Sequence, residues 1–151
     1  MKNLVFNGTF LLFALTICSF QAPNPTVQEI FQEALNIETL AEHLIKDEDG
    51  NLLPLTISTN SLLSEKMNLS LHGKMVSIID NATNTATTAS ILDLTEVKMK
   101  GKKSMLAFQY GEKTIKIRLK KEADDWVAKT ISIKWKNGLT FKTVSTSEEH
   151  F

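Results

Sequence analysis

Large apolar residues recur at every second position in parts of the second half of the chain, and this alternation constrains the fold more than any other feature. Apolar residues occupy every second position of two segments, namely Leu106, Phe108 and Tyr110, and then Ile115, Ile117 and Leu119. Successive side chains of a β-strand point to opposite faces, so this pattern predicts strands with one buried and one wet face. We therefore expect an antiparallel sheet that is covered on one side.

Turn-forming residues divide the same region into hairpins. They lie at Gly101-Lys102-Lys103, Gly111-Glu112-Lys113, Glu122 to Asp125, and Asn137-Gly138. The last of these is the strongest hairpin signal. The apolar positions change parity between Leu94 and Val97, which predicts a β-bulge or a bend. In the strand before Asn137 the expected core residues are Val127, Ile131, Ile133 and Trp135, and a last strand begins at Leu139.

An amphipathic helix is predicted before the strands. Thr26-Val27-Gln28-Glu29 has the pattern of a capping box, and apolar residues follow at helical spacing as far as Ile45. The turn-forming segment 47–51 should end this helix. Short strands are expected at 52–57, 69–71 and 75–79, with one or two helical turns at 60–67.

These elements predict an α+β fold in which an N-terminal amphipathic helix packs on a curved, mainly antiparallel sheet of about four to six strands. The expected organisation is a single domain at residues 23–145, preceded by a signal peptide at 1–22 and followed by a flexible C-terminal tail at 146–151.

The order of elements and the hairpin GEKTIKIRLKKEADDWVAKTISIKW (residues 111–135) resemble the helix-wrapped sheets of the NTF2-like and cystatin-like superfamilies, over about residues 26–144. The resemblance implies a domain that can serve as an enzyme, an inhibitor or a binding module. The QxVxG motif of cystatins is absent, which puts an inhibitor function in doubt. No functional residue is carried over from either superfamily.

Residues 1–22 have the layout of a secretory signal peptide. Lys2 is positive, Leu11 to Ile17 are apolar, and Ala22 is a small residue at a possible cleavage point. The apolar run is much shorter than the ~20 residues of a membrane span. We expect an exported protein, periplasmic or secreted, with no transmembrane segment in the mature chain. Because Leu15 to Cys18 loosely resemble a lipobox, a lipid anchor on Cys18 is the alternative.

Charge is segregated along the chain. Residues 23–95 contain ten acidic residues and three lysines, whereas residues 96–142 contain thirteen basic and five acidic residues. Strand spacing should gather many of these cations on one face of the sheet. The candidate binding residues are Lys98, Lys100, Lys116, Arg118, Lys120, Lys134 and Lys136. Such a face attracts an anionic glycan, a lipid headgroup or an acidic partner protein; the alternative is a solvated face that protects strands from aggregation.

Catalytic and metal-binding patterns are not found in the sequence. The histidines are scattered and lack an HExxH motif, and the spacing from Asp47 does not fit an EF-hand. There is no GxSxG elbow and no Gly-rich phosphate loop. We therefore expect no cofactor and no metal. A nucleic acid partner is not expected either, because we expect the protein to be exported and the basic sheet face lacks interleaved aromatic residues. In an NTF2-like pocket, the candidates for a general acid or base would be Asp80, Asp93 or His72.

The sequence thus favours an exported, non-catalytic binding domain that engages an anionic surface component or a partner protein through a basic sheet face. One alternative is an NTF2-like pocket protein, either a small-molecule carrier or an enzyme. Another is a structural envelope lipoprotein.

Overall fold

The computed structural model describes residues 25–59, 67–80 and 90–144. The predicted signal peptide with Cys18, nearly all of segment 60–67 and the C-terminal tail lie outside these ranges. The described elements are α1 (Pro25–Leu35), α2 (Glu38–Glu42), β1 (Thr56–Thr59), β2 (Ser70–Leu71), β3 (Lys74–Met75), β4 (Ser77–Asp80), β5 (Ile91–Lys100), β6 (Lys103–Tyr110), β7 (Lys113–Glu122), β8 (Asp125–Trp135) and β9 (Thr140–Val144).

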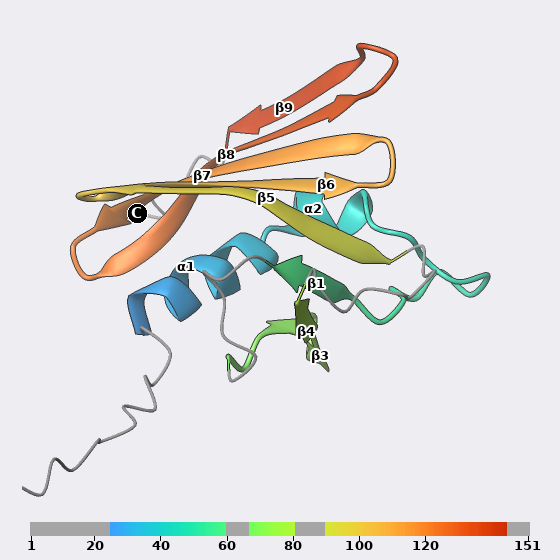
Figure 1. Cartoon of the computed structure of the whole chain (residues 1–151), viewed down its shortest axis with the longest axis horizontal. Coiled ribbons are helices and arrows are strands. Elements are labelled where there is room, and N and C mark those ends of the chain that lie inside the picture. Colours follow the sequence, from blue (N-terminus) through green and yellow to red (C-terminus); the bar gives the residue numbers. More distant parts are fainter. Residues whose placement is uncertain (1–24, 60–66, 81–89, 145–151) are drawn as a thin grey trace, which may run out of the picture.

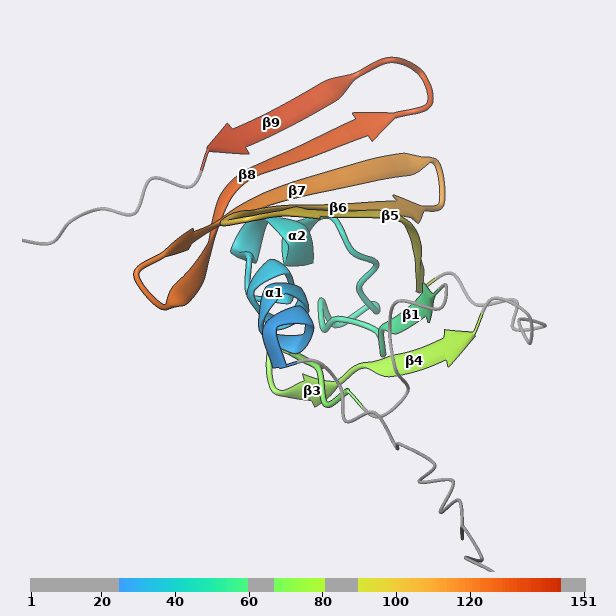
Figure 2. The same ribbon diagram turned by 60° about the vertical axis from the view of Figure 1, so that its left-hand side comes forward.

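Seven strands form one open sheet in the order β4-β1-β5-β6-β7-β8-β9. Strand β1 runs parallel to its neighbours β4 and β5, whereas the other pairs of this sheet are antiparallel. Strands β2 and β3 form a separate antiparallel pair. The sheet curls around α1, so that β6 to β9 lie on one side of the helix and β4 on the other (Figure 1, Figure 2). The predicted mixed α+β class is confirmed.

The strand count exceeds the prediction of about four to six, because the short strands β1 and β4 extend the sheet in parallel. Parallel neighbours are joined by long connections rather than tight turns, so local sequence gives no signal for their pairing. The segment predicted as a strand at 52–57 contributes only a bridge between Leu52 and Lys46 before β1 begins at Thr56. Pro54, which has no N–H to donate, lies between them.

The prediction of one helix from Thr26 to Ile45 is wrong, because the helix is divided. Helix α1 ends at Leu35, Ile37 has an extended backbone (φ −69°, ψ 116°), and α2 follows at Glu38–Glu42. Asparagine and isoleucine, which stand at this break, are poorer helix formers than leucine or glutamate. Helix α1 also begins at Pro25, so Thr26 lies within its first turn and is not the N-cap of the predicted capping box.

The core lies between the helices and the sheet. Phe31 of α1 meets Phe108 of β6 edge to face, with ring centroids 6.2 Å apart. The alternation predicted for β6 and β7 is confirmed for the large apolar residues, which are buried at every second position; in β6 the small Ala107 between two of them is buried as well. The side chains that fill this layer include Leu35, Leu40, Leu106, Ile115, Ile117 and Ile133.

Two bulges interrupt the antiparallel ladders. The first skips Thr95 in the pairing of β5 with β6, as the parity change predicts. The second skips Lys129, between Ala128 and Thr130 of β8. The alternation in the sequence gives no signal for this second bulge, and the prediction that Val127 lies on the core side is wrong. The buried residues there are instead Trp126 and Ala128, while Trp135 packs, partly buried, against the core.

Candidate functional site

The face of the sheet turned away from the helices carries rows of basic residues. Paired residues of antiparallel strands lie on one face, with Cβ atoms about 5 Å apart. From β5 toward β9 the rows are Lys100 with Lys103, Lys120 and Val127; Lys98 with Met105, Arg118 and Thr130; Glu96 with Ala107, Lys116, Ser132 and Lys142; and Asp93 with Gln109, Thr114, Lys134 and Thr140. We call the surface formed by the cations of these rows the basic face.

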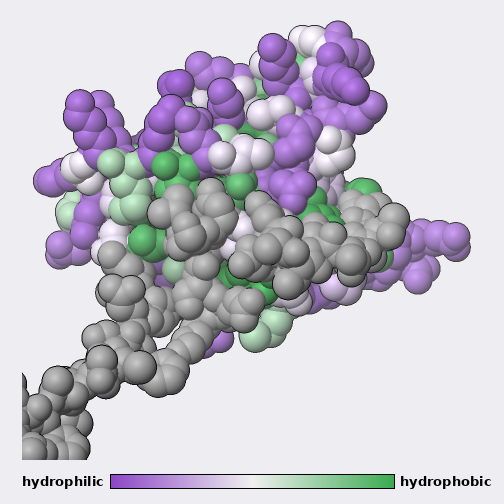
Figure 3. Space-filling view, viewed as in Figure 1, coloured by the Kyte–Doolittle hydropathy of each residue, from purple (hydrophilic) through white to green (hydrophobic). Residues whose placement is uncertain are grey.

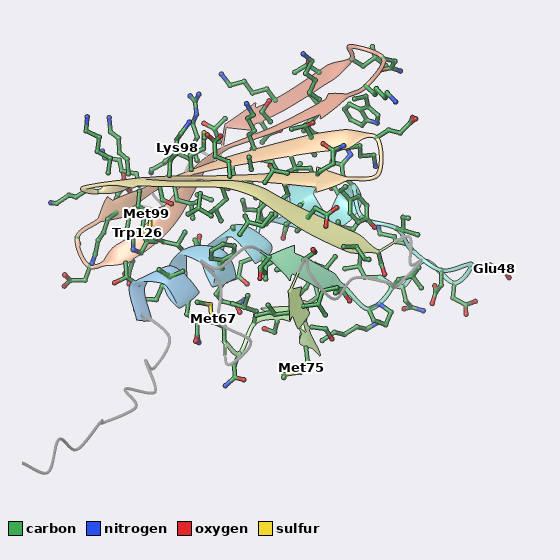
Figure 4. All side chains as sticks on the ribbon, viewed as in Figure 1. Glu48, Met67, Met75, Lys98, Met99 and Trp126 are labelled. Carbon is green, nitrogen blue, oxygen red and sulfur yellow. The ribbon has the colours of Figure 1, made fainter. Side chains whose placement is uncertain are left out.

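The side-chain views agree with this register. Figure 4 shows Lys98 on the side of the sheet opposite to the helices, whereas Met99 and Trp126 lie on the helix side. In the space-filling view, hydrophilic residues gather over the strands that are farthest from α1 (Figure 3). The alternation of the strands thus separates a charged surface from the apolar core.

A groove of about 440 Å³ lies on the basic face. Met105, which is partly buried, stands between Lys98 and Arg118 in one row, next to the row of Lys103. The bulge in β8 adds a further ammonium from Lys129. The groove is lined by Lys98, Lys100, Lys103, Ser104, Met105, Arg118, Leu119, Lys120, Lys129 and Thr130. It therefore combines an apolar centre with a cationic rim.

Acidic side chains neutralise part of the basic face. Glu96 forms an ion pair with Lys98, and its hydrogen bond from Lys98 holds the pKa of Glu96 below the ordinary value. Glu122 pairs with Lys129 at 2.9 Å and approaches Lys120 at 3.9 Å. In the described part of the chain, no ion pair is formed by Lys100, Lys103, Lys116 or Arg118. Their charges are left to attract an anion from solution.

The structure brings most of the predicted site residues onto one surface. Lys98, Lys100, Arg118 and Lys120 line the groove, and Lys116 and Lys134 lie in the adjoining rows. Lys136 is the exception, because it lies beyond the end of β8, where its main-chain N–H donates to the oxygen of Glu112 at 2.9 Å. Lys103, Met105, Lys129 and Lys142 also belong to this surface, although they are not among the candidate binding residues predicted from the sequence.

In the described ranges, the other candidate residues do not form a catalytic or metal-binding site. His72 lies in the turn between β2 and β3, Asp93 lies on β5 opposite Gln109, and these two residues do not line a common cleft. Within residues 25–59, 67–80 and 90–144, no three His, Cys, Asp or Glu side chains are grouped as metal ligands. The helices of those ranges are too short to cross a lipid bilayer.

Comparisons with protein-family models, with curated proteins and with solved structures find no match to this chain. Its function is therefore inferred from its own sequence and geometry. Clustered ammonium and guanidinium groups around a half-buried thioether side chain can bind an anion by charge and apolar contact together.

Proposed function

We propose that this protein is an exported, non-catalytic binding domain whose basic face binds an anionic component of a cell surface, such as a charged glycan or a lipid headgroup. The observation that carries the proposal is the groove around Met105. Lys98, Lys103 and Arg118 surround this apolar residue. Several cations of the groove have no acidic partner in the described residues, so their charge is available to bind an anion.

Binding to two kinds of probe tests this proposal. One probe is dextran sulfate, and the other is vesicles of phosphatidylglycerol and phosphatidylcholine, so that the two sources of anionic groups are separated. We expect binding to weaken steeply between about 50 and 500 mM salt, because the Debye length shortens over this range. Affinity that does not change with salt, or the absence of binding to either probe, would count against the proposal. Preference for polyglutamate over both probes would point to an acidic partner protein instead.

Charge reversal identifies the surface responsible. Arg118→Glu with Lys120→Glu changes two cations of the groove, and we expect binding of the preferred probe to be abolished. Lys46→Glu with Lys74→Glu is the matched control, because it changes the net charge by the same amount at exposed positions outside the basic face. Equal losses in the two variants would mean that net charge, and not this groove, governs binding.

Export is the second part of the proposal, and it is supported by the charge and apolar pattern of residues 1–22. The intact mass of the protein from its native host tests it. A soluble form cut near Ala22 agrees with a periplasmic or secreted domain. A form that begins at a lipid-modified Cys18 would favour the structural envelope lipoprotein, and an uncut chain would contradict export.

The NTF2-like alternative requires an enclosed cavity between helix and sheet. Phe31, Phe108 and Ile117 occupy that layer, and each is at most 1% exposed. The described interior thus offers the pocket protein no specific support, and we place the binding site on the open face.

A further inference from the structure

The sheet has an open edge at β9, on the side of the molecule away from β4. Among the described residues, β9 pairs with β8 only and is the last strand of the sheet. Apolar side chains near this edge remain exposed: Leu139, in the turn before β9, is 66% exposed, and Phe141 of β9 is 39% exposed. An unpaired edge presents free backbone N–H and C=O groups, which can pair with another extended chain.

A cleft of about 320 Å³ adjoins this edge on the helix side of the sheet. It lies between the break that separates α1 from α2 and the bulge of β8. From the helices it is lined by Glu33, Asn36, Ile37, Glu38 and Thr39, and from the strands by Ala128, Thr130, Ile131 and Thr143. Thr143 of β9 therefore connects the open edge to the cleft.

The cleft carries negative charge that is not compensated within the described residues. Glu33 and Glu38 face it from the two helices, and neither forms an ion pair there. A basic side chain entering the cleft would find two carboxylates and the hydroxyl groups of Thr39 and Thr143. The charge is opposite to that of the basic face, so the two surfaces select opposite ligands.

We propose that β9 binds an extended segment of a partner protein, which adds to the sheet as an eighth strand and inserts a lysine or arginine into this cleft. Main-chain hydrogen bonds to an edge strand provide affinity, and pockets for alternate side chains provide specificity. Phe141 and Thr143 are two residues apart on the helix side of β9. The segment should therefore carry an apolar residue opposite Phe141 and a basic residue two positions away, opposite Thr143.

A synthetic peptide tests this proposal directly. The probe is acetyl-Ser-Thr-Val-Thr-Lys-Thr-Val-Thr-Ser-amide, and its counterpart has Glu in place of Lys. The full mature chain, labelled with nitrogen-15, is titrated with each peptide. We expect the Lys peptide to shift the amide signals of β9 and of residues 36–39, and to bind about tenfold more tightly than the Glu peptide. Equal binding of the two peptides, or shifts confined to the basic face, would overturn the proposal.

Two pairs of variants locate the binding determinants. Glu33→Gln with Glu38→Gln should lower the affinity for the Lys peptide about fivefold, whereas the exposed pair Glu29→Gln with Glu42→Gln, which lies outside the cleft, should not. Neighbouring N–H groups of an edge strand point alternately toward and away from the paired strand. One of Lys142→Pro and Thr143→Pro should therefore keep the native unfolding temperature, and that variant should lose peptide binding.

The results distinguish a segment of a partner protein from a second copy of this chain as the ligand of the β9 edge. Retained peptide binding in the natively folded proline variant would overturn strand addition. A dimer formed by the chain alone, measured by sedimentation and abolished by the same proline, would assign the edge to a second copy and overturn the proposed partner. These results do not depend on the basic face, because the Lys peptide carries no negative charge.

Discussion

The side-chain ammonium of Lys113, at the start of β7, donates a hydrogen bond of 2.8 Å to the main-chain oxygen of His43, the C-cap residue of α2. Carbonyl groups at the end of a helix lack helical partners and carry partial negative charge, so a cation there is favourable. The hydroxyl of Tyr110 accepts a second hydrogen bond, of 3.0 Å, from the N–H of Ile45. Two side chains of the β6–β7 hairpin thus hold the chain as it leaves α2.

Lys113→Met is expected to lower the free energy of unfolding by about 1 kcal/mol, because it removes a charge-assisted hydrogen bond at a partly exposed site. It should also raise the pKa of His43, since the positive charge of Lys113 helps to lower it. Urea unfolding and an NMR titration of the imidazole measure the two effects. Lys116→Met, at an exposed position of the same strand, should change stability by less than about 0.5 kcal/mol; equal effects of the two variants would refute the anchoring role.

His43 should make stability depend on pH near neutrality. Burial lowers its pKa below 6.5, Lys113 lowers it further, and Glu42 acts in the opposite direction. Below pH 6.5 the unfolded chain therefore binds the proton more readily than the folded protein. The contribution of His43 is fully present above this pH and is lost as the pH falls from 6.5 toward the lowered pKa of the folded state.

Urea unfolding at several pH values from about 8 to 5 checks this. His43→Gln should flatten the dependence in this window, whereas His72→Asn, in the exposed turn after β2, should keep it. The ring of His43 also lies 5.5 Å from Trp135 and 5.4 Å from Phe141, between centroids. A wild-type profile that is flat from pH 8 to the lowest pH tested would contradict this prediction.

The fold is predictable where one segment contains its own signal. Strands β6 and β7 alternate and are bounded by turns at Gly101, at Gly111 and at residues 122–125, so their limits and large buried residues follow from the sequence. The parallel pairing of β1 joins segments that are far apart in the sequence, and the break of the helix at Ile37 has only a weak local signal, the low helix propensity of asparagine and isoleucine. The bulge at Lys129 cannot be predicted from the sequence either. Val127 and Ile131 fit the alternation of an unbroken strand, so the pattern does not indicate an extra residue between them.

The same distinction applies to the basic face: features within one strand are predictable, and features that depend on strand pairing are not. The sequence places Lys116, Arg118 and Lys120 on one face, since they lie on one strand. Whether Lys103 and Met105 lie on the basic face depends on the register between β5, β6 and β7, which no local sequence pattern determines. Lys136 continues the alternation of Lys134 in the sequence, but it lies past Trp135, where β8 ends, and so is not part of the basic face.

The pair Phe31 and Phe108 should carry much of the stability of the helix–sheet layer. Each ring is 1% exposed, so Phe31→Ala should destabilise the protein by about 3–5 kcal/mol. Phe31→Leu, Phe108→Leu and the double variant form a cycle that keeps most of the volume. We expect a coupling energy of about 1 kcal/mol from the edge-to-face contact. Additive effects in urea unfolding would show that the rings contribute through burial alone.

Met105→Glu should change stability and binding in opposite directions. The new carboxylate would stand between Lys98 and Arg118, in direct register with both. Opposite charges at paired positions of a sheet stabilise by about 0.2–1 kcal/mol, so the unfolding midpoint should rise slightly. Binding of an anionic probe should be lost, because the carboxylate occupies the groove and repels the ligand.

Met75→Glu is the control for this variant, since Met75 is 73% exposed on β3, in the separate β2–β3 pair. It should leave both quantities unchanged. If Met105→Glu lowered stability by more than about 1 kcal/mol, apolar packing of the thioether rather than the surrounding charge would dominate at this position. If the stabilised variant still bound the probe, the groove would not be the binding site. A gain in stability with a loss of binding would mean that the wild-type protein retains like-charge repulsion on this face in order to bind an anion.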